Sequence, residues 1–239
     1  MRVNWNYIKG FLLLVLVGFL FAFSSSRNQS RKITELEVKF LDDNNLFVTH
    51  ETVNKLLIQN GETVTNVPKE ILDLNGLENA LKSNAMIKTA EVYLAVNGKV
   101  RADVVQRKPI ARVSTNASYY IDDEGKYMPL STNYTAHVPI VTGSVEKNNL
   151  ANIFKIASKI YEDEFLKTHI VEIHQEQDQT LSLKTRVYDF EIELGDLNDL
   201  DKKINNLKAF YQKTKKDKTL SSYKKVNLQF NNQVVCTKK

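Results

Sequence analysis

Hydrophobic and polar positions divide the chain into one long apolar run and two regions of shorter, periodic segments. The apolar run extends from Phe11 to Phe23 without a charge, and Arg2 and Lys9 carry the only charged side chains before it. Counted back to Tyr7, about seventeen residues at about 1.5 Å each just cross a hydrocarbon core of roughly 30 Å. The run therefore has the length and composition of a membrane anchor.

We predict a single transmembrane anchor at residues 10–26, preceded by a cytoplasmic segment at 1–9 and followed by a polar linker at 27–32. A cleaved signal peptide is the alternative, because small residues around Ala22 and Ser24 have the spacing of a cleavage site. An N-terminal signal this close to the start normally inserts with its short end inside. Under both interpretations the bulk of the chain crosses the membrane.

The region after the linker changes from strand-like to helix-like spacing. Leu36, Val38 and Phe40 alternate with polar residues, which predicts a strand. Two helical stripes follow, and each comes after a residue that can cap a helix N-terminus, Thr49 for the first and Asp73 for the second. We therefore predict one strand followed by two short helices.

Two further alternating runs meet at Asn97–Gly98, a pair typical of a hairpin turn. A two-residue loop there would place apolar side chains opposite charged ones. We predict instead a three-residue loop at 97–99, with a bulge beside the glycine, because this loop pairs Leu94 with Ala102 on one apolar face. The region 33–107 is thus expected to form a small strand-helix-helix-hairpin domain.

The alternating pattern breaks at residues 106–109. Arg107 and Lys108 interrupt it with charge, and Pro109 cannot donate a hydrogen bond to a central ladder. A strand must therefore end, bulge or change sheets here. We interpret this seam as the boundary between the first domain and a second domain at 108–239.

The second domain is predicted to be rich in strands. A hairpin is expected to turn at the acidic segment 122–125, and short strands are expected around 138–143, 170–173, 181–187 and 190–194. Amphipathic spacing predicts two helices, at 150–161 and 200–211. The predicted fold class is α+β, with a transmembrane helix, a small first domain, and a β-rich domain that combines an antiparallel sheet with two helices.

The last predicted strand, residues 225–235, is long, and one of its faces carries almost no charge. If this strand lies at the edge of the sheet, its unpaired backbone groups offer another chain a place to add a strand. A central strand with a polar solvent face is the other interpretation.

Composition and charge narrow the possible functions. The chain has 239 residues, of which 42% are hydrophobic and 26% charged, so it can bury real cores. Its net charge of +5 is only mildly basic, and the lysine run at 213–218 is more typical of a solvated helix end than of nucleic-acid binding. Cys236 is the only cysteine, which excludes an intrachain disulfide and a thiolate zinc site.

The sequence contains no phosphate loop, zincin helix, nucleophile elbow or glycine-rich dinucleotide turn. Its histidines are scattered, and the one close pair, His169 and His174, would point to opposite faces of a strand. Carboxylates are plentiful, but none has a context that predicts a raised pKa. We therefore predict no cofactor, no metal site and no small-molecule substrate, while acid/base catalysis stays open and without support from the sequence.

The seam also carries a recognisable pattern, formed by Arg107, Pro109 and Ala111. With the short N-terminal segment, the anchor and the order of the two domains, this pattern resembles the bacterial cell-division family FtsQ, also called DivIB. The seam of that family typically has an acidic residue followed by Arg-x-Pro-apolar-Ala. The chain has Gln106 in place of the acidic residue.

Two further segments resemble the same family. Residues 120–125, followed by Pro129, look like the turn after the first strand of the family's β domain. Residues 226–234 look like its last strand, with Gln229 and Phe230 where the family commonly has Arg and Tyr. The resemblance therefore covers nearly the whole chain.

The resemblance implies a polypeptide-transport-associated (POTRA) domain at 33–107, a β domain at 108–239, and no catalytic activity. It implies a scaffold of the divisome at the division septum, held in the inner membrane by a single span, with most of the chain in the periplasm. The implied partners are FtsB-like and FtsL-like membrane proteins, one of which adds a strand at the end of the β domain. The predicted docking residues are Leu228, Gln229, Phe230, Asn231, Asn232, Gln233 and Val234.

Two other classes stay open from the sequence. A secreted or periplasmic protein-binding module would have lost the N-terminal segment by cleavage. A cell-envelope hydrolase would need a concave pocket with paired carboxylates.

Overall fold

The computed structural model describes residues 5–29, 33, 35–42, 45–58, 68, 72–95, 97–230 and 233–239. The chain divides into two compact units between Gln106 and Arg107. The N-terminal helix, α1 (Trp5–Gln29), contains a stretch of 19 residues, Ile8–Ser26, with a mean hydropathy of 2.1. This helix is long and apolar enough to cross a membrane.

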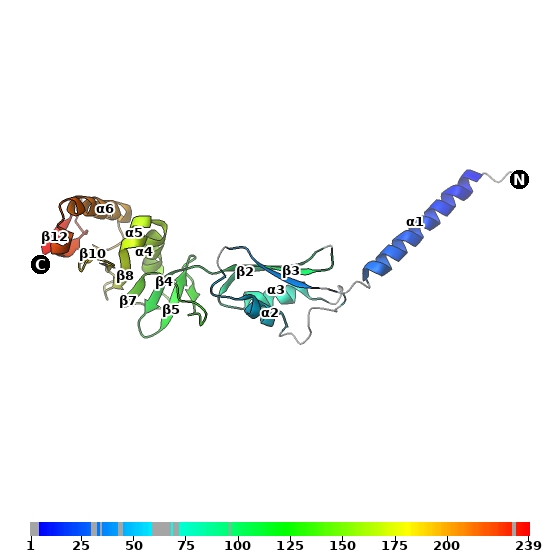
Figure 1. Cartoon of the computed structure of the whole chain (residues 1–239), viewed down its shortest axis with the longest axis horizontal. Helices are drawn as coiled ribbons and strands as arrows, with labels where there is room; N and C mark the ends of the chain where they lie inside the picture. Colours follow the sequence, from blue (N-terminus) through cyan, green and yellow to red (C-terminus); the bar gives the residue numbers. More distant parts are fainter. Residues whose placement is uncertain are drawn as a thin grey trace. The chain divides into compact units, whose positions relative to one another are not determined.

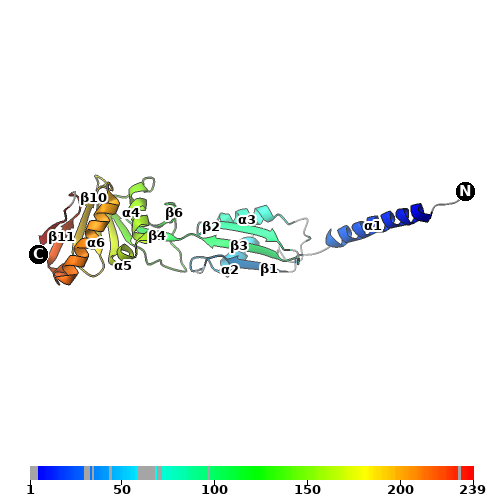
Figure 2. The same cartoon turned by 90° about the horizontal axis from the view of Figure 1, so that it is seen from above.

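The first unit has a three-stranded sheet covered on one face by two helices (Figures 1 and 2). The strand order is β1-β3-β2, with β1 parallel and β2 antiparallel to the central strand β3. The predicted order of strand, two helices and hairpin is confirmed. The elements are β1 (Leu36–Phe40), α2 (His50–Ile58), α3 (Leu74–Lys82), β2 (Ile87–Leu94) and β3 (Val100–Gln106).

Both predicted helix caps form. The Thr49 hydroxyl oxygen accepts a hydrogen bond from the Thr52 N–H at 3.2 Å, and the Asp73 carboxylate accepts one from the Gly76 N–H at 2.9 Å. Each cap satisfies an N–H group that has no partner within its helix. Local sequence therefore fixes where α2 and α3 begin.

The hairpin between β2 and β3 has the predicted apolar face but a different register. Leu94 pairs with Val100 rather than with Ala102. The Ala95 N–H donates to the Lys99 carbonyl oxygen at 2.8 Å, so the pairing of the two strands extends to these two residues and Lys99 is not part of the loop. Both registers keep apolar side chains on one face, and the pattern alone could not separate them. The bulge lies near the start of β2, between Ile87 and Thr89, and not beside the glycine.

Gln106, the last residue of β3, is buried and closes the first unit. Its side-chain oxygen Oε1 accepts hydrogen bonds from the N–H groups of Phe47 and Val48, at 3.0 and 2.9 Å. These two residues lead into α2. The end of the sheet is thereby joined to the start of the helical layer by one amide side chain.

The second unit contains a nine-stranded sheet in the order β12-β11-β10-β9-β8-β7-β4-β5-β6. Helices α4, α5 and α6 lie on one face of it (Figures 1 and 2). The strands are β4 (Pro109–Ser114), β5 (Ser118–Asp122), β6 (Tyr127–Met128), β7 (Ile140–Gly143), β8 (Ile170–Gln175), β9 (Leu181–Thr185), β10 (Glu191–Gly195), β11 (Tyr223–Asn227) and β12 (Val235–Lys238). The helices are α4 (Ala151–Glu162), α5 (Glu164–His169), α6 (Leu200–Lys216) and a short 3-10 helix at Leu220–Ser222.

This sheet is mixed, whereas the sequence pattern predicted an antiparallel one. The pairs β4·β7, β7·β8 and β10·β11 are parallel. A parallel pair needs a crossover connection, and the helices provide it: α4 and α5 connect β7 to β8, and α6 connects β10 to β11. The two predicted helices are present as α4 and α6, and α5 is an additional short helix that begins after the N-cap Asp163.

An ion pair within the second unit holds its first residue in place. The Asp122 carboxylate is fully buried, and its Oδ2 lies 2.6 Å from Nη1 of Arg107. Its Oδ1 accepts hydrogen bonds from the N–H groups of Glu124 and Lys126, at 3.0 and 2.7 Å. Asp122 therefore shapes the predicted turn and also holds the segment that enters the second unit.

The Gln106 contact gives a test of the first unit. Replacement of Gln106 by leucine removes the acceptor for two backbone N–H groups, and a buried donor left without its partner costs about 1–3 kcal/mol. We expect the Gln106→Leu variant to lose that amount of unfolding free energy and the Val48 amide to exchange faster with solvent. Hydrogen exchange measured residue by residue checks both.

The matched control is Gln106→Glu, which keeps an acceptor oxygen at the same position. It should protect the Val48 amide better than leucine does. Equal protection of this amide in the leucine variant and the native chain would contradict the role of Gln106.

Candidate protein-binding edge

The outermost strand at the C-terminal side of the large sheet is β12. It pairs antiparallel with β11, and β11 pairs parallel with β10. Among the described residues no strand pairs with the other side of β12. A strand in this position presents N–H and C=O groups that a second chain can use.

The continuous strand predicted at 225–235 is not formed. β11 ends at Asn227, and the chain resumes as β12 at Val235. The side-chain oxygen of Asn227 accepts a hydrogen bond from the Gln229 N–H at 2.8 Å. This local turn competes with the sheet ladder and ends the strand, which the alternating pattern did not reveal.

The predicted docking residues consequently lie in the connection between β11 and β12. Leu228 is buried, and its N–H donates to the Glu193 carbonyl oxygen at 2.9 Å. Phe230 is 48% exposed, and Val234 packs against the core. Asn231 and Asn232 lie outside the described residues. The predicted docking residues therefore precede the edge strand β12 and do not form it.

The open side of β12 can be assigned from its hydrogen bonds. The Lys239 N–H donates to the Ser222 carbonyl oxygen at 2.9 Å, so this amide faces the β11 side. Successive residues of an antiparallel strand direct their backbone groups to alternate sides, so those of Cys236 and Lys238 point outward. The bulge in this pair lies on β11 and leaves the alternation along β12 intact.

Exposed apolar side chains accompany this edge. Val235, at the start of β12, is 43% exposed, and Phe230 lies in the connection just before it. Cys236 has the opposite orientation, and its side chain packs against the core. Burial raises the pKa of the Cys236 thiol, so it stays protonated at neutral pH. The edge thus offers backbone groups together with two apolar side chains.

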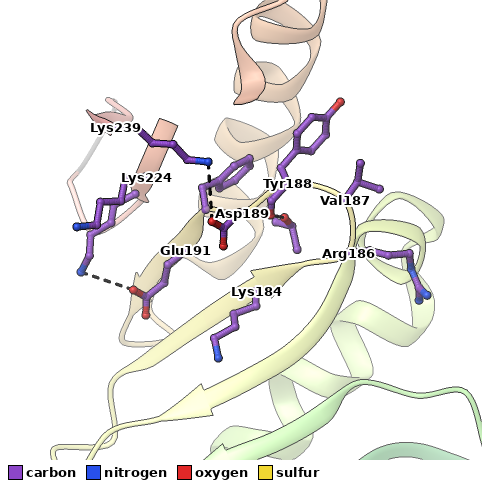
Figure 3. Close-up of a pocket in the computed structure, with 11 residues that line it drawn as sticks. Lys184, Arg186, Val187, Tyr188, Asp189, Glu191, Lys224 and Lys239 are labelled. Carbon is purple, nitrogen blue, oxygen red and sulfur yellow. Dashed lines mark hydrogen bonds and ion pairs between the residues drawn. The ribbon is translucent and has the colours of Figure 1, made fainter. Parts of the chain in front are cut away.

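A charged hollow of about 690 Å³ lies beside β11, under the loop between β9 and β10 (Figure 3). Its carboxylates face lysines: Asp189 lies 3.8 Å from Lys239, and Glu191 lies 3.6 Å from Lys225. Nζ of Lys225 donates a hydrogen bond to the Glu193 carboxylate at 2.6 Å, which raises the pKa of Lys225. Five basic side chains and two carboxylates line the hollow, so it is basic overall although its carboxylates are paired.

Aromatic side chains hold α6 on the sheet behind this edge. Tyr211 of α6 packs against Phe165, Tyr188 and Phe190, with ring centroids 5.0, 6.3 and 5.8 Å away. In Figure 3 the Tyr188 ring points toward the helix. Because α6 connects β10 to β11, this cluster fixes the strand to which the edge strand pairs.

The seam residues Arg107, Pro109 and Ala111 are placed at the start of the second unit. Arg107 pairs with Asp122, Pro109 begins β4 opposite the same residue, and Ala111 is fully buried. Across the residues that the structure describes, no group of three His, Cys, Asp or Glu side chains could hold a metal ion. The seam is therefore a structural feature of the domain boundary.

The two folded units define a class of protein in which a POTRA-like domain precedes a β domain. A family model described as a POTRA-like domain matches residues 31–105, and one described as FtsQ/DivIB, C-terminal related, matches residues 108–237. The second match covers more than half of the chain, which therefore belongs to the FtsQ/DivIB family. No curated protein matches the chain. These domains indicate a divisome-related, non-enzymatic protein.

The aromatic cluster gives a test by pH. Burial raises the pKa of Tyr211 from its usual value near 10 to about 12. Between these values the unfolded chain binds fewer protons at this group than the folded chain, so stability falls as the pH rises. Its contribution is fully present below pH 10, and about 1.4 kcal/mol of it is lost at pH 11.

The Tyr211→Phe variant isolates this effect from the titration of lysines. We expect the native chain to lose about 1.4 kcal/mol more unfolding free energy than the variant between pH 9 and pH 11. Denaturant unfolding at the two pH values measures the difference. Equal losses in the two proteins would show that Tyr211 titrates alike in the folded and unfolded states.

Proposed function

We propose that the chain is a non-enzymatic scaffold of the bacterial divisome that spans the inner membrane once through α1. Its two domains lie in the periplasm at the division septum and bind FtsB-like and FtsL-like membrane proteins. The observation that carries the proposal is the open edge of β12 in a chain whose domains belong to the FtsQ/DivIB family.

The edge is suited to bind an extended segment of a partner. The outward N–H and C=O groups of Cys236 and Lys238 supply the backbone pairing, which contributes affinity for any extended chain. Val235 and Phe230 supply exposed apolar surface next to it. Of the side chains first predicted to contact a partner, we retain Phe230, and we replace Val234 by Val235 because Val234 packs against the core.

Proline at position 238 tests the pairing directly. Lys238→Pro removes one outward N–H and places a ring at the open edge, while the bonds between β11 and β12 do not use this group. We expect capture of FtsB-like protein from detergent-solubilised membranes to fall by about tenfold or more, as the loss of a backbone hydrogen bond with added steric hindrance implies.

The matched control is Lys238→Ala, which removes the same side chain but keeps the N–H. It should capture the partner as the native chain does, and both variants should unfold at the native temperature. Full capture by a folded Lys238→Pro protein would rule out strand addition at β12.

The membrane anchor is tested by the mass of the mature protein. If α1 is retained as an anchor, the protein isolated from cells fractionates with membranes and has the mass of the full 239-residue chain. A mature protein in the soluble fraction that begins near Ser24 would instead support the secreted or periplasmic binding module.

A further inference from the structure

A second hollow, of about 340 Å³, lies where the parallel strands of the β domain begin. Strands β4, β7 and β8 run in the same direction, so their first residues meet at one end of the sheet. Four isoleucines contribute to its walls, together with the segment 135–139 that leads into β7. They are Ile110, Ile140, Ile160 and Ile170. Strand β8 is separated from the edge strand β12 by β9, β10 and β11.

The charged groups that line this hollow are all basic. They are Arg112 of β4, Lys167 of α5 and Arg186 of the loop after β9, with His137 close by on the covering segment. No aspartate or glutamate is among the residues that line it. Cations gathered around a hollow that no carboxylate lines create a positive potential in it.

Arg112 is the most informative of these residues. Its backbone N–H donates to the Pro139 carbonyl oxygen at 2.9 Å, which fixes the residue beside the covering segment. Its Nε is buried and has no hydrogen-bond partner, and in the described part of the chain its guanidinium makes no ion pair. Arg107, five residues earlier on the same segment, is paired with Asp122. Nε itself is enclosed, so a ligand would meet the other nitrogens of the half-buried Arg112 guanidinium, whose charge no carboxylate among the described residues neutralises in an ion pair.

The other two cations are only weakly engaged. Nε of Arg186 donates to the neutral carbonyl of Thr168 at 3.2 Å, and its side chain points away from the ion pairs beside β11 (Figure 3). Nζ of Lys167 lies 3.8 Å from Glu164, but both groups are largely exposed, and such pairs contribute little. Both cations can therefore interact with an incoming anion.

We propose that this hollow binds a carboxylate carried on a small aliphatic body, with Arg112 as the principal anion-binding residue. A guanidinium matches the two oxygens of a carboxylate, and the exposed side chain of Ile140 matches an aliphatic group, while Ile110, Ile160 and Ile170 are almost fully buried behind it. Phosphate has no apolar body and would leave the exposed surface of Ile140 in water. The volume lies at the lower end of the range of roughly 300–1,000 Å³ for ligand pockets.

N-acetyl-leucine is a suitable probe, because it combines a carboxylate with an aliphatic side chain. N-acetyl-leucinamide has the same body without the charge, and inorganic phosphate has charge without the body. The full chain in neutral detergent, labelled at its isoleucine methyl groups, reports binding at the four isoleucines of the wall. We expect saturable shifts of these methyl signals with N-acetyl-leucine and none with the amide or with phosphate.

Variants then assign the binding to Arg112. Arg112→Gln should weaken binding of N-acetyl-leucine by about tenfold or more, since one charge-assisted hydrogen-bonded pair is lost. The matched control is Arg101→Gln in the first unit, whose guanidinium pairs with Glu37 at 3.1 Å. The control should bind the probe as the native chain does. If Arg112→Gln does not fold, Arg186→Gln serves as the second variant, with weaker binding expected.

The proposal is overturned if the isoleucine signals do not shift, if the amide binds as well as the acid, or if folded Arg112→Gln and Arg186→Gln bind with native affinity. A tripeptide, N-acetyl-Ala-Ala-Leu with a free C-terminus, separates the two sources of such a carboxylate. Tighter binding than N-acetyl-leucine supports a protein segment as the ligand, and equal or weaker binding supports a small acid. Both results support a carboxylate site.

Discussion

The fully buried carboxylate of Asp122 is the centre on which the second domain is assembled. One oxygen binds the Arg107 guanidinium, and the other accepts two backbone N–H groups of the following turn. A buried charge that loses its partner costs about 3–5 kcal/mol, so this arrangement tolerates little change. It fixes the start of β4 against β5, and the parallel strands β7 and β8 are then added to the other side of β4.

The residues on the two sides of the boundary serve different units. Gln106 turns its amide oxygen to the backbone of Phe47 and Val48 in the first unit, while Arg107 reaches Asp122 in the second. A single peptide bond therefore separates Gln106, whose side chain is bound within the first unit, from Arg107, whose side chain is bound within the second. An amide oxygen at position 106 accepts the same two N–H groups that a carboxylate would accept, which explains how glutamine can replace the acidic residue of the family pattern.

The sequence predicted what depends on neighbours along the chain. Capping by Thr49 and Asp73, the turn at 122–125 and the amphipathic spacing of α4 and α6 all follow from local residues. The parallel pairings could not be predicted in the same way, because a strand pattern does not state the direction of its partner. The predicted hairpin register was wrong because two registers place the same apolar residues on one face. The predicted last strand was wrong because the Asn227 side chain forms a turn inside a segment whose residues alternate like those of a strand.

In the candidate binding surfaces, too, the features that depend on pairing between distant strands could not be predicted from the sequence. The sequence predicted a docking strand at 228–234, whereas the outward groups of Cys236 and Lys238 follow from the pairing of β12 with β11. In the second hollow, Arg112, Lys167 and Arg186 come from three separate elements, and only the parallel start of β4, β7 and β8 brings them together. No local pattern marks such a cluster, since each residue alone is an ordinary cation on a strand, a helix or a loop.

The two surfaces would recognise a ligand by different physics. Backbone pairing at an open edge binds any extended chain and carries little sequence information, so its selectivity depends on nearby side chains such as Val235 and Phe230. A basic hollow with aliphatic walls is selective by charge and shape but small. Strands β9, β10 and β11 lie between the hollow at β8 and the edge strand β12, and Tyr211 of α6 packs against Phe190, just before β10. A ligand at one surface would therefore contact none of the residues that we assign to the other.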